Sequence, residues 1–83
     1  MTLYLYAVED KLVGFMNPFV MQNDSQALRS FKMTVNAQDN NPIAKCPSDM
    51  SLWRLASFDE KDGAIVADKQ KLADASAVKE VQQ

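Results

Sequence analysis

One stretch of the chain predicts both a strand and the helix that has to pack on it. In residues 17–35 (NPFVMQNDSQALRSFKMTV), an apolar run leads through a polar turn into a segment with apolar side chains at helical spacing. This apolar stripe is formed by Ala27, Leu28, Phe31 and Val35. A helix this short needs a surface that covers its stripe. The sequence therefore predicts one amphipathic helix, at about residues 25–36, that lies on a sheet.

Two neighbouring residues are suited to cap the start of this helix. The carboxylate of Asp24 makes it a good N-cap, because it accepts hydrogen bonds from the first free N–H groups of a helix. Asn23, followed three residues later by Gln26, offers a capping box as the alternative.

Four short segments carry the β-prone residues that would form the sheet. They are residues 3–8, 13–21, 50–58 and 64–67. Pro18 removes one backbone donor from the second segment, so we expect that strand at an edge of the sheet or with a bulge near Asn17. The acidic turn 59–63 joins the last two strands as a hairpin.

The first and third strands have apolar side chains on both faces. In the first strand, Leu3, Leu5 and Ala7 point to one face and Tyr4, Tyr6 and Val8 to the other. In the third, alternation places Leu52, Ala56 and Phe58 on the face of Arg54, and Trp53 with Leu55 on the opposite face. The helix covers one face of the first strand, which leaves the other for a partner or a ligand. Because an 83-residue chain has a thin core, we expect self-association as a homodimer.

The remaining segments complete the expected domain. Residues 37–49 contain two prolines and little periodicity, which predicts a surface loop. Residues 68–83 are rich in alanine and predict a weakly helical, acidic C-terminal tail. We therefore assign residues 1–67 to a single two-layer α+β domain of order β-β-α-β-β, with an antiparallel sheet and one packed helix.

The residue types argue against an enzyme. The chain has no histidine and a single cysteine, Cys46, which we interpret as an incidental loop residue rather than a reactive thiol. The acidic residues of the turn 59–63 lack the ligand spacing of a calcium loop and are interpreted as a solvated turn. We expect no catalytic residues, no cofactor and no metal. We also expect a soluble, cytosolic protein without signal peptide or membrane segment, because no apolar run approaches about 20 residues.

The remaining functional signal comes from aromatic and basic side chains, which single-stranded nucleic acid contacts by base stacking and phosphate pairing. The candidate nucleic-acid-binding residues are Tyr4, Tyr6, Arg29, Lys32, Trp53 and Arg54. The alternatives are that the aromatic residues form the core or a subunit interface, and that Arg29 and Lys32 are solvated charge. The formal net charge of −2 argues against binding of duplex DNA by bulk attraction.

Several motifs together resemble a known family. The segments LYAVED, GFMNPFVMQND, QALRSFKMTVN and SDMSLWRLASFDEKDGAIV, within residues 3–67, resemble the small nonstructural protein of gokushoviruses, single-stranded DNA phages of the Microviridae. The resemblance implies a non-enzymatic protein that binds single-stranded DNA and assists phage genome replication in the cytoplasm of the bacterial host. The alternative is a protein-interaction module that engages a phage or host replication protein without contacting DNA.

Overall fold

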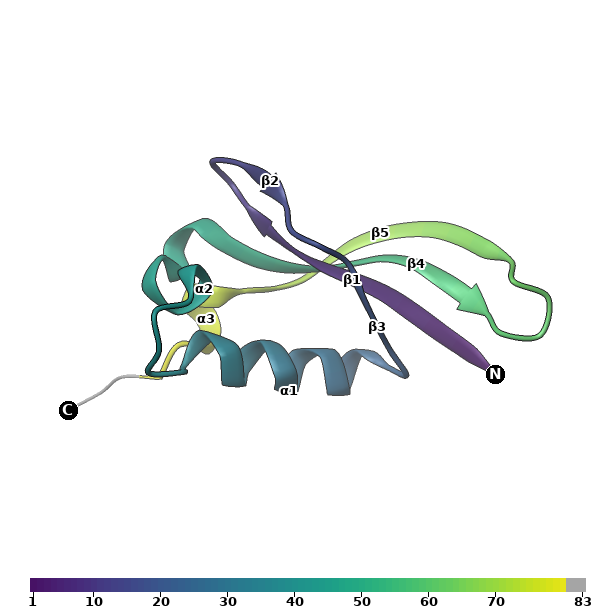
Figure 1. The fold of residues 1–83 in the computed structure, drawn as a ribbon, viewed down its shortest axis with the longest axis horizontal. Helices are drawn as coiled ribbons and strands as arrows, with labels where there is room; N and C mark the ends of the chain where they lie inside the picture. The colour runs from purple at the N-terminus through teal and green to yellow at the C-terminus, as the bar shows by residue number, and fades with distance from the viewer. Residues whose placement is uncertain (81–83) are drawn as a thin grey trace.

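The protein consists of one antiparallel sheet with its helices on one side, as shown by a computed structural model in which residues 1–80 are described (Figure 1). The strands are β1 (Thr2–Asp10), β2 (Gly14–Phe15), β3 (Phe19–Met21), β4 (Met50–Asp59) and β5 (Ile65–Asp74). The helices are α1 (Asp24–Val35), α2 (Pro42–Lys45), the 3-10 turn η1 (Pro47–Asp49) and α3 (Ala75–Val78). The predicted α+β class is confirmed.

Strand β1 lies at the centre of the sheet. It pairs on one side with β4, which pairs in turn with β5. On its other side it pairs first with β2 and then with β3, so these two short strands form one interrupted edge. The interruption falls at residues 16–18, where Pro18 has no backbone N–H to donate. The predicted edge position of this segment is confirmed.

Helix α1 packs its apolar stripe on one face of the sheet. Ala27 and Val35 are fully buried and Phe31 is 3% exposed. The core that they form with the sheet and the C-terminal segment also contains Tyr6, Val8, Met50, Leu52 and Ala75. Leu28 is partly buried at the margin of this core. The predicted stripe is therefore the packing face of the helix.

The start of α1 is capped by Asn23, so the assignment of Asp24 as the N-cap is wrong; of the alternative capping box, the half contributed by Asn23 is confirmed. The Oδ1 atom of Asn23 accepts a hydrogen bond of 2.9 Å from the backbone N–H of Gln26. Gln26 Oε1 accepts a 3.4 Å hydrogen bond from the backbone N–H of Gln22, one residue before the N-cap. Asp24 is therefore free to use its carboxylate elsewhere.

Two segments differ from the sequence predictions. Part of the expected loop 37–49 is helical, because Asn41 caps α2 by accepting a 2.7 Å hydrogen bond from the N–H of Ala44, and Pro42 fits the first turn. The predicted helical tail is wrong for residues 68–74, which continue β5. Pairing with β4 along this length outweighs the helical preference of its alanines and lysines. Only Ala75–Val78 is helical, and residues 81–83 of the predicted tail lie outside the described residues.

A bulge in β4 changes which face its second half presents. Tyr6 pairs with Arg54, whereas the preceding Leu5 pairs with Ala56, so Leu55 is the extra residue. Beyond the bulge, Ala56 and Phe58 share the face of Leu5, which points away from α1. The prediction that Ala56 and Phe58 lie on the face of Arg54 is therefore wrong, because strict alternation does not hold across the bulge.

We predict that Phe31→Ala lowers the free energy of unfolding by about 3–5 kcal/mol, because the ring is buried in the core. Urea denaturation followed by circular dichroism measures the change. Met33→Ala is the matched control, since Met33 lies on the same helix but is 69% exposed, and it should change the stability little. Equal effects of the two substitutions would contradict the packing described for α1.

We predict that Asn23→Ala destabilises the protein by about 1 kcal/mol, because the N–H of Gln26 loses its capping acceptor. Ser25→Ala, an exposed position in the first helical turn, should have a smaller effect. Thermal denaturation of both variants tests the assignment, and a larger loss for Ser25→Ala would contradict it.

Candidate nucleic-acid interface

The sheet face opposite α1, here called the open face, has a regular layout. Residues that pair across the strands form rows, because directly opposite side chains point to the same face. Two apolar rows consist of Leu3, Phe58 and Ile65, and of Val20, Leu5, Ala56 and Ala67. The next rows consist of Ala7, Trp53 and Lys71, and of Phe15, Glu9, Ser51 and Asp74. The open face thus has an apolar half and a half that mixes aromatic and charged residues.

Phe15, Trp53 and Lys69 form a cluster in the mixed half. The ring centroids of Phe15 and Trp53 lie 6.0 Å apart with an edge-to-face orientation. The Nζ of Lys69 lies 4.8 Å from the centroid of Phe15 and 5.1 Å from that of Trp53. Three strands contribute one residue each, so the cluster exists only in the folded sheet. We name it the Phe15–Trp53–Lys69 cluster.

The parts of this cluster differ in how they are held. Trp53 donates a hydrogen bond of 2.9 Å from Nε1 to the buried Ser51, which fixes the orientation of the indole. Phe15 is 40% exposed and Lys69 is exposed, so one ring and the ammonium group remain accessible. A fixed indole beside an accessible ring and a lysine is an arrangement that stacks a base and pairs with a phosphate.

The local charge around the cluster is nearly balanced. Lys71, in the same row as Trp53, lies 3.3 Å from the carboxylate of Asp74, and both are partly exposed. Glu9 occupies the row of Phe15. The cluster therefore offers Lys69 and the partly neutralised Lys71 to an anion, which limits the number of phosphates it contacts.

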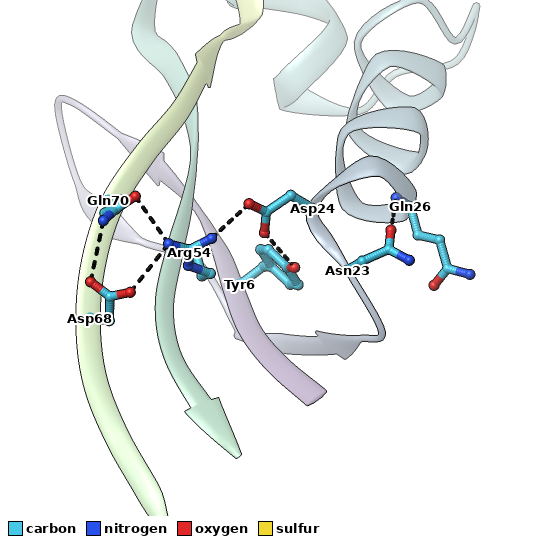
Figure 2. Close-up of polar contacts among 7 residues, drawn as sticks. All are labelled: Tyr6, Asn23, Asp24, Gln26, Arg54, Asp68 and Gln70. Carbon is cyan, nitrogen blue, oxygen red and sulfur yellow. Dashed lines mark hydrogen bonds and ion pairs between the residues drawn. The ribbon is translucent and has the colours of Figure 1, made fainter. Parts of the chain in front are cut away.

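Two of the predicted site residues, Tyr6 and Arg54, belong instead to a polar network under α1 (Figure 2). The hydroxyl of Tyr6 donates to Asp24 at 2.8 Å, and Arg54 Nη1 lies 2.6 Å from the other carboxylate oxygen of Asp24. Arg54 Nη2 also donates to Asp68 and Gln70 on β5. One guanidinium thus joins β4 to β5 and to the start of α1.

This network engages the groups that would otherwise bind nucleic acid. Tyr6 is fully buried, so its ring cannot stack with a base. Its pKa is raised well above the usual value by burial and by the hydrogen bond to Asp24. The guanidinium of Arg54 has two carboxylate partners, Asp24 and Asp68, and is not available to a phosphate in this arrangement.

The other predicted site residues lie apart from one another. Tyr4 lies on the face of α1, where Arg54 is 5.6 Å from its ring centroid. Arg29 and Lys32 are exposed on α1, and Lys32 pairs with Glu80 at 3.5 Å. Trp53 is the one predicted residue in the cluster on the open face. The structure therefore does not bring the six predicted residues together.

Sequence reasoning missed Phe15 and Lys69. Phe15 lies in the second predicted strand, residues 13–21, but the sequence does not assign it to a face because Pro18 interrupts that strand. Lys69 falls in the segment predicted to be helical, so no pattern linked it to Trp53. Lys69 and Lys71 are two residues apart, which would place both on one face of a strand. This pattern becomes informative only when β5 is known to continue past Ala67.

Within residues 1–80, no group of three His, Cys, Asp or Glu side chains is placed to bind a metal ion. No helix of this part of the chain is long and apolar enough to cross a membrane.

These features define a small α+β protein with helices on one face of its sheet and an aromatic cluster with a lysine on the other. The sequence profile of the phage ORF5 protein family matches residues 3–78, and the chain therefore belongs to this family of phage proteins. The match confirms that the chain is a small phage protein and includes the whole of β5. Comparisons with curated proteins and with solved structures found no significant match.

We predict that Tyr6→Phe lowers the stability by about 1 kcal/mol at neutral pH, because the hydrogen bond to Asp24 is lost. The pKa of Tyr6 is raised in the folded protein above its unfolded value of about 10. Folded Tyr6 keeps a proton that the unfolded chain releases, so its contribution to stability falls as the pH rises above about 10.

Urea denaturation of the wild type and Tyr6→Phe at neutral and alkaline pH tests this dependence. The difference in free energy of unfolding between the two proteins should shrink above pH about 10. Comparison with the variant isolates the contribution of Tyr6, because every other ionisable group is present in both proteins. A difference that stays constant with pH would contradict the assignment.

Proposed function

We propose that this protein binds single-stranded DNA weakly and without sequence preference, as a non-enzymatic accessory protein of phage genome replication. The observation that supports this most directly is the Phe15–Trp53–Lys69 cluster, which combines two rings and a cation on an uncovered sheet face. Sheet domains hold single strands by stacking bases on such rings and pairing phosphates with nearby cations.

The geometry suggests how the cluster binds. In the free protein, the ammonium group of Lys69 lies over both rings. When it turns to a phosphate, the accessible side of Phe15 is freed for a base, and Trp53 supports that ring from its edge. Bases of every kind can stack on this surface, because every base has an aromatic face.

The motifs of the sequence support a narrower assignment within the phage ORF5 family. We infer that the phage is a gokushovirus of the Microviridae, which has a single-stranded DNA genome, and that the protein acts in the cytoplasm of the bacterial host. The family match to residues 3–78 supports the phage origin, and the motifs in residues 3–67 support the narrower group. A single-stranded genome provides the polymer that the cluster fits.

The alternative function is a protein-interaction module for a phage or host replication protein. The exposed apolar residues Ile65 (63%) and Val66 (61%) on the β4–β5 hairpin favour it. The formal net charge of −2 also favours it, because the charge of the whole chain repels DNA. Binding to an oligonucleotide distinguishes the two functions.

We predict that a labelled oligo(dT) binds with a small salt dependence. If Lys69 and Lys71 neutralise two phosphates, the log–log slope of affinity against salt should be about −1.4, at about −0.7 per phosphate of a single strand. Lys69→Ala should weaken binding and reduce the slope to about −0.7. Stacking near the indole should quench the fluorescence of Trp53, the single tryptophan of the chain.

Two controls make this titration decisive. Lys45→Ala removes one positive charge from the exposed end of α2, outside the cluster, and should leave the slope unchanged. Circular dichroism at each salt concentration shows that the protein is folded. A folded protein that binds no oligonucleotide at low salt would refute DNA binding and favour the protein-interaction module.

A further inference from the structure

We propose that the open face docks a second copy of this chain, with the strands of the two copies antiparallel. The apolar rows of the two copies face each other, and the acidic β4–β5 turn of each copy lies against Lys69 and Lys71 of the other. Three observations lead to this arrangement: an apolar half without a covering layer in the described chain, an acidic turn on one side of it with two lysines on the other, and two sheet edges that are poorly suited to pairing.

The apolar half of the open face has no covering layer in the described chain. Its rows include Ile65, which is 63% exposed, and Val20, which is 49% exposed. Helix α1 lies on the opposite face, and the β4–β5 hairpin extends past the start of α1 (Figure 1). A contiguous apolar surface of this kind marks an interaction site.

An acidic turn lies on one side of this apolar half, and two lysines, of which Lys71 pairs with Asp74, lie on the other. On one side lies the turn 59–62, whose three carboxylates and one lysine give a net charge of −2. On the other side, beyond the row of Ala56, lie Lys69 and Lys71 of β5. Strand β1 shows the order of these groups along the sheet. Thr2 pairs with Asp59 at the start of the acidic turn, and Ala7 lies in the row of Lys71. The apolar rows that contain Leu3 and Leu5 therefore lie between the turn and the lysines.

This order of charges selects the antiparallel orientation. A two-fold axis that lies between the sheets, perpendicular to the strands and level with the apolar rows, places β5 of one copy over β5 of the other. The acidic turn of each copy then lies over the two lysines of its partner. With parallel strands, the two acidic turns would lie at the same end, where like charges repel.

Both edges of the sheet are less suited to a second copy than its face. The edge formed by β2 and β3 is interrupted at residues 16–18. The outer edge belongs to β5, where charged and amide side chains follow one another at Asp68, Lys69, Gln70 and Lys71. Such charges on an edge strand oppose pairing with another strand. Face-to-face packing of two sheets, about 10 Å apart, is the arrangement that remains.

Sedimentation velocity over a range of protein concentrations tests the docking surface. The wild type should show a concentration-dependent monomer–dimer equilibrium. Ile65→Asp should raise the dimer dissociation constant at least about tenfold, because a carboxylate would be buried among apolar rows. Val66→Asp is the matched control, since Val66 is equally exposed but pairs with Ser57 and points to the other face.

A charge exchange tests the orientation. Glu60→Lys and Lys69→Glu should each weaken self-association, because each places like charges opposite one another. An equimolar mixture of the two variants should form a heterodimer, because one pair of contacts in it joins the native Glu60 to the native Lys69 and the other joins the introduced lysine to the introduced glutamate. Circular dichroism shows that each variant is folded.

Three results would overturn the proposal. One is a wild type that stays monomeric at all concentrations, and another is Val66→Asp weakening the dimer as strongly as Ile65→Asp. The third is a mixture of the exchanged variants that associates no better than each alone, since the antiparallel orientation requires their pairing.

One consequence rests on the proposed function, because Lys69 serves both surfaces. Oligo(dT) should convert the dimer to monomer, since the acidic turn of the partner occupies the place of a phosphate. If oligo(dT) binds and the dimer stays intact, the antiparallel arrangement is wrong. If oligo(dT) does not bind at all, the DNA-binding function fails, whereas the sedimentation of Ile65→Asp still decides the docking surface.

Discussion

One long helix covers only one face of this sheet, and the rest of the structure depends on that limit. The buried apolar side chains of α1 pack in the core with Tyr6 and Leu52, on the inner face of the sheet. Strand β1 is nevertheless apolar on both faces, and within residues 1–80 no second layer covers the face of Leu3 and Leu5. The described residues leave this face open, and the proposed DNA site and the proposed docking surface both lie on it.

The division of roles between Asn23 and Asp24 connects that helix to the sheet. Because Asn23 caps α1, the carboxylate of Asp24 is available to Tyr6 on β1 and Arg54 on β4. A partly buried carboxylate with two donors orients the helix more strictly than apolar packing does, since the hydrogen bonds have fixed lengths and angles. The ion pairs with Asp24 and Asp68 also hold the guanidinium of Arg54 on the inner face of the sheet. Positive charge on the open face comes instead from Lys69 and Lys71 of β5.

Features set by neighbouring residues could be predicted from the sequence. The stripe of α1 follows from helical spacing, and the edge position of the second strand follows from Pro18. The class of fold follows from these elements and their order. In each case the physical cause lies within a few residues of the feature it determines.

Features set by distant residues could not be predicted in this way. The strand conformation beyond Ala67 depends on pairing with β4, and the hydrogen bonds of Asp24 depend on Tyr6 and Arg54, which are distant in the sequence. The Phe15–Trp53–Lys69 cluster requires three strands to be in register at once. A local pattern contains none of this information, because the same alternation of residues fits either face of a sheet until the pairing is known.

Because of the bulge at Leu55, the apolar side chains in the two halves of β4 point to different faces of the sheet. On the side of Arg54 the strand is tied to α1, whereas beyond the bulge Ala56 and Phe58 point away from it. If the same sequence paired without the bulge, strict alternation would turn Ala56 and Phe58 to the face of Arg54 and away from Leu5 and Leu3. The extra residue therefore lets a strand whose sequence alternates along its whole length supply side chains to the core from one half and to the open face from the other.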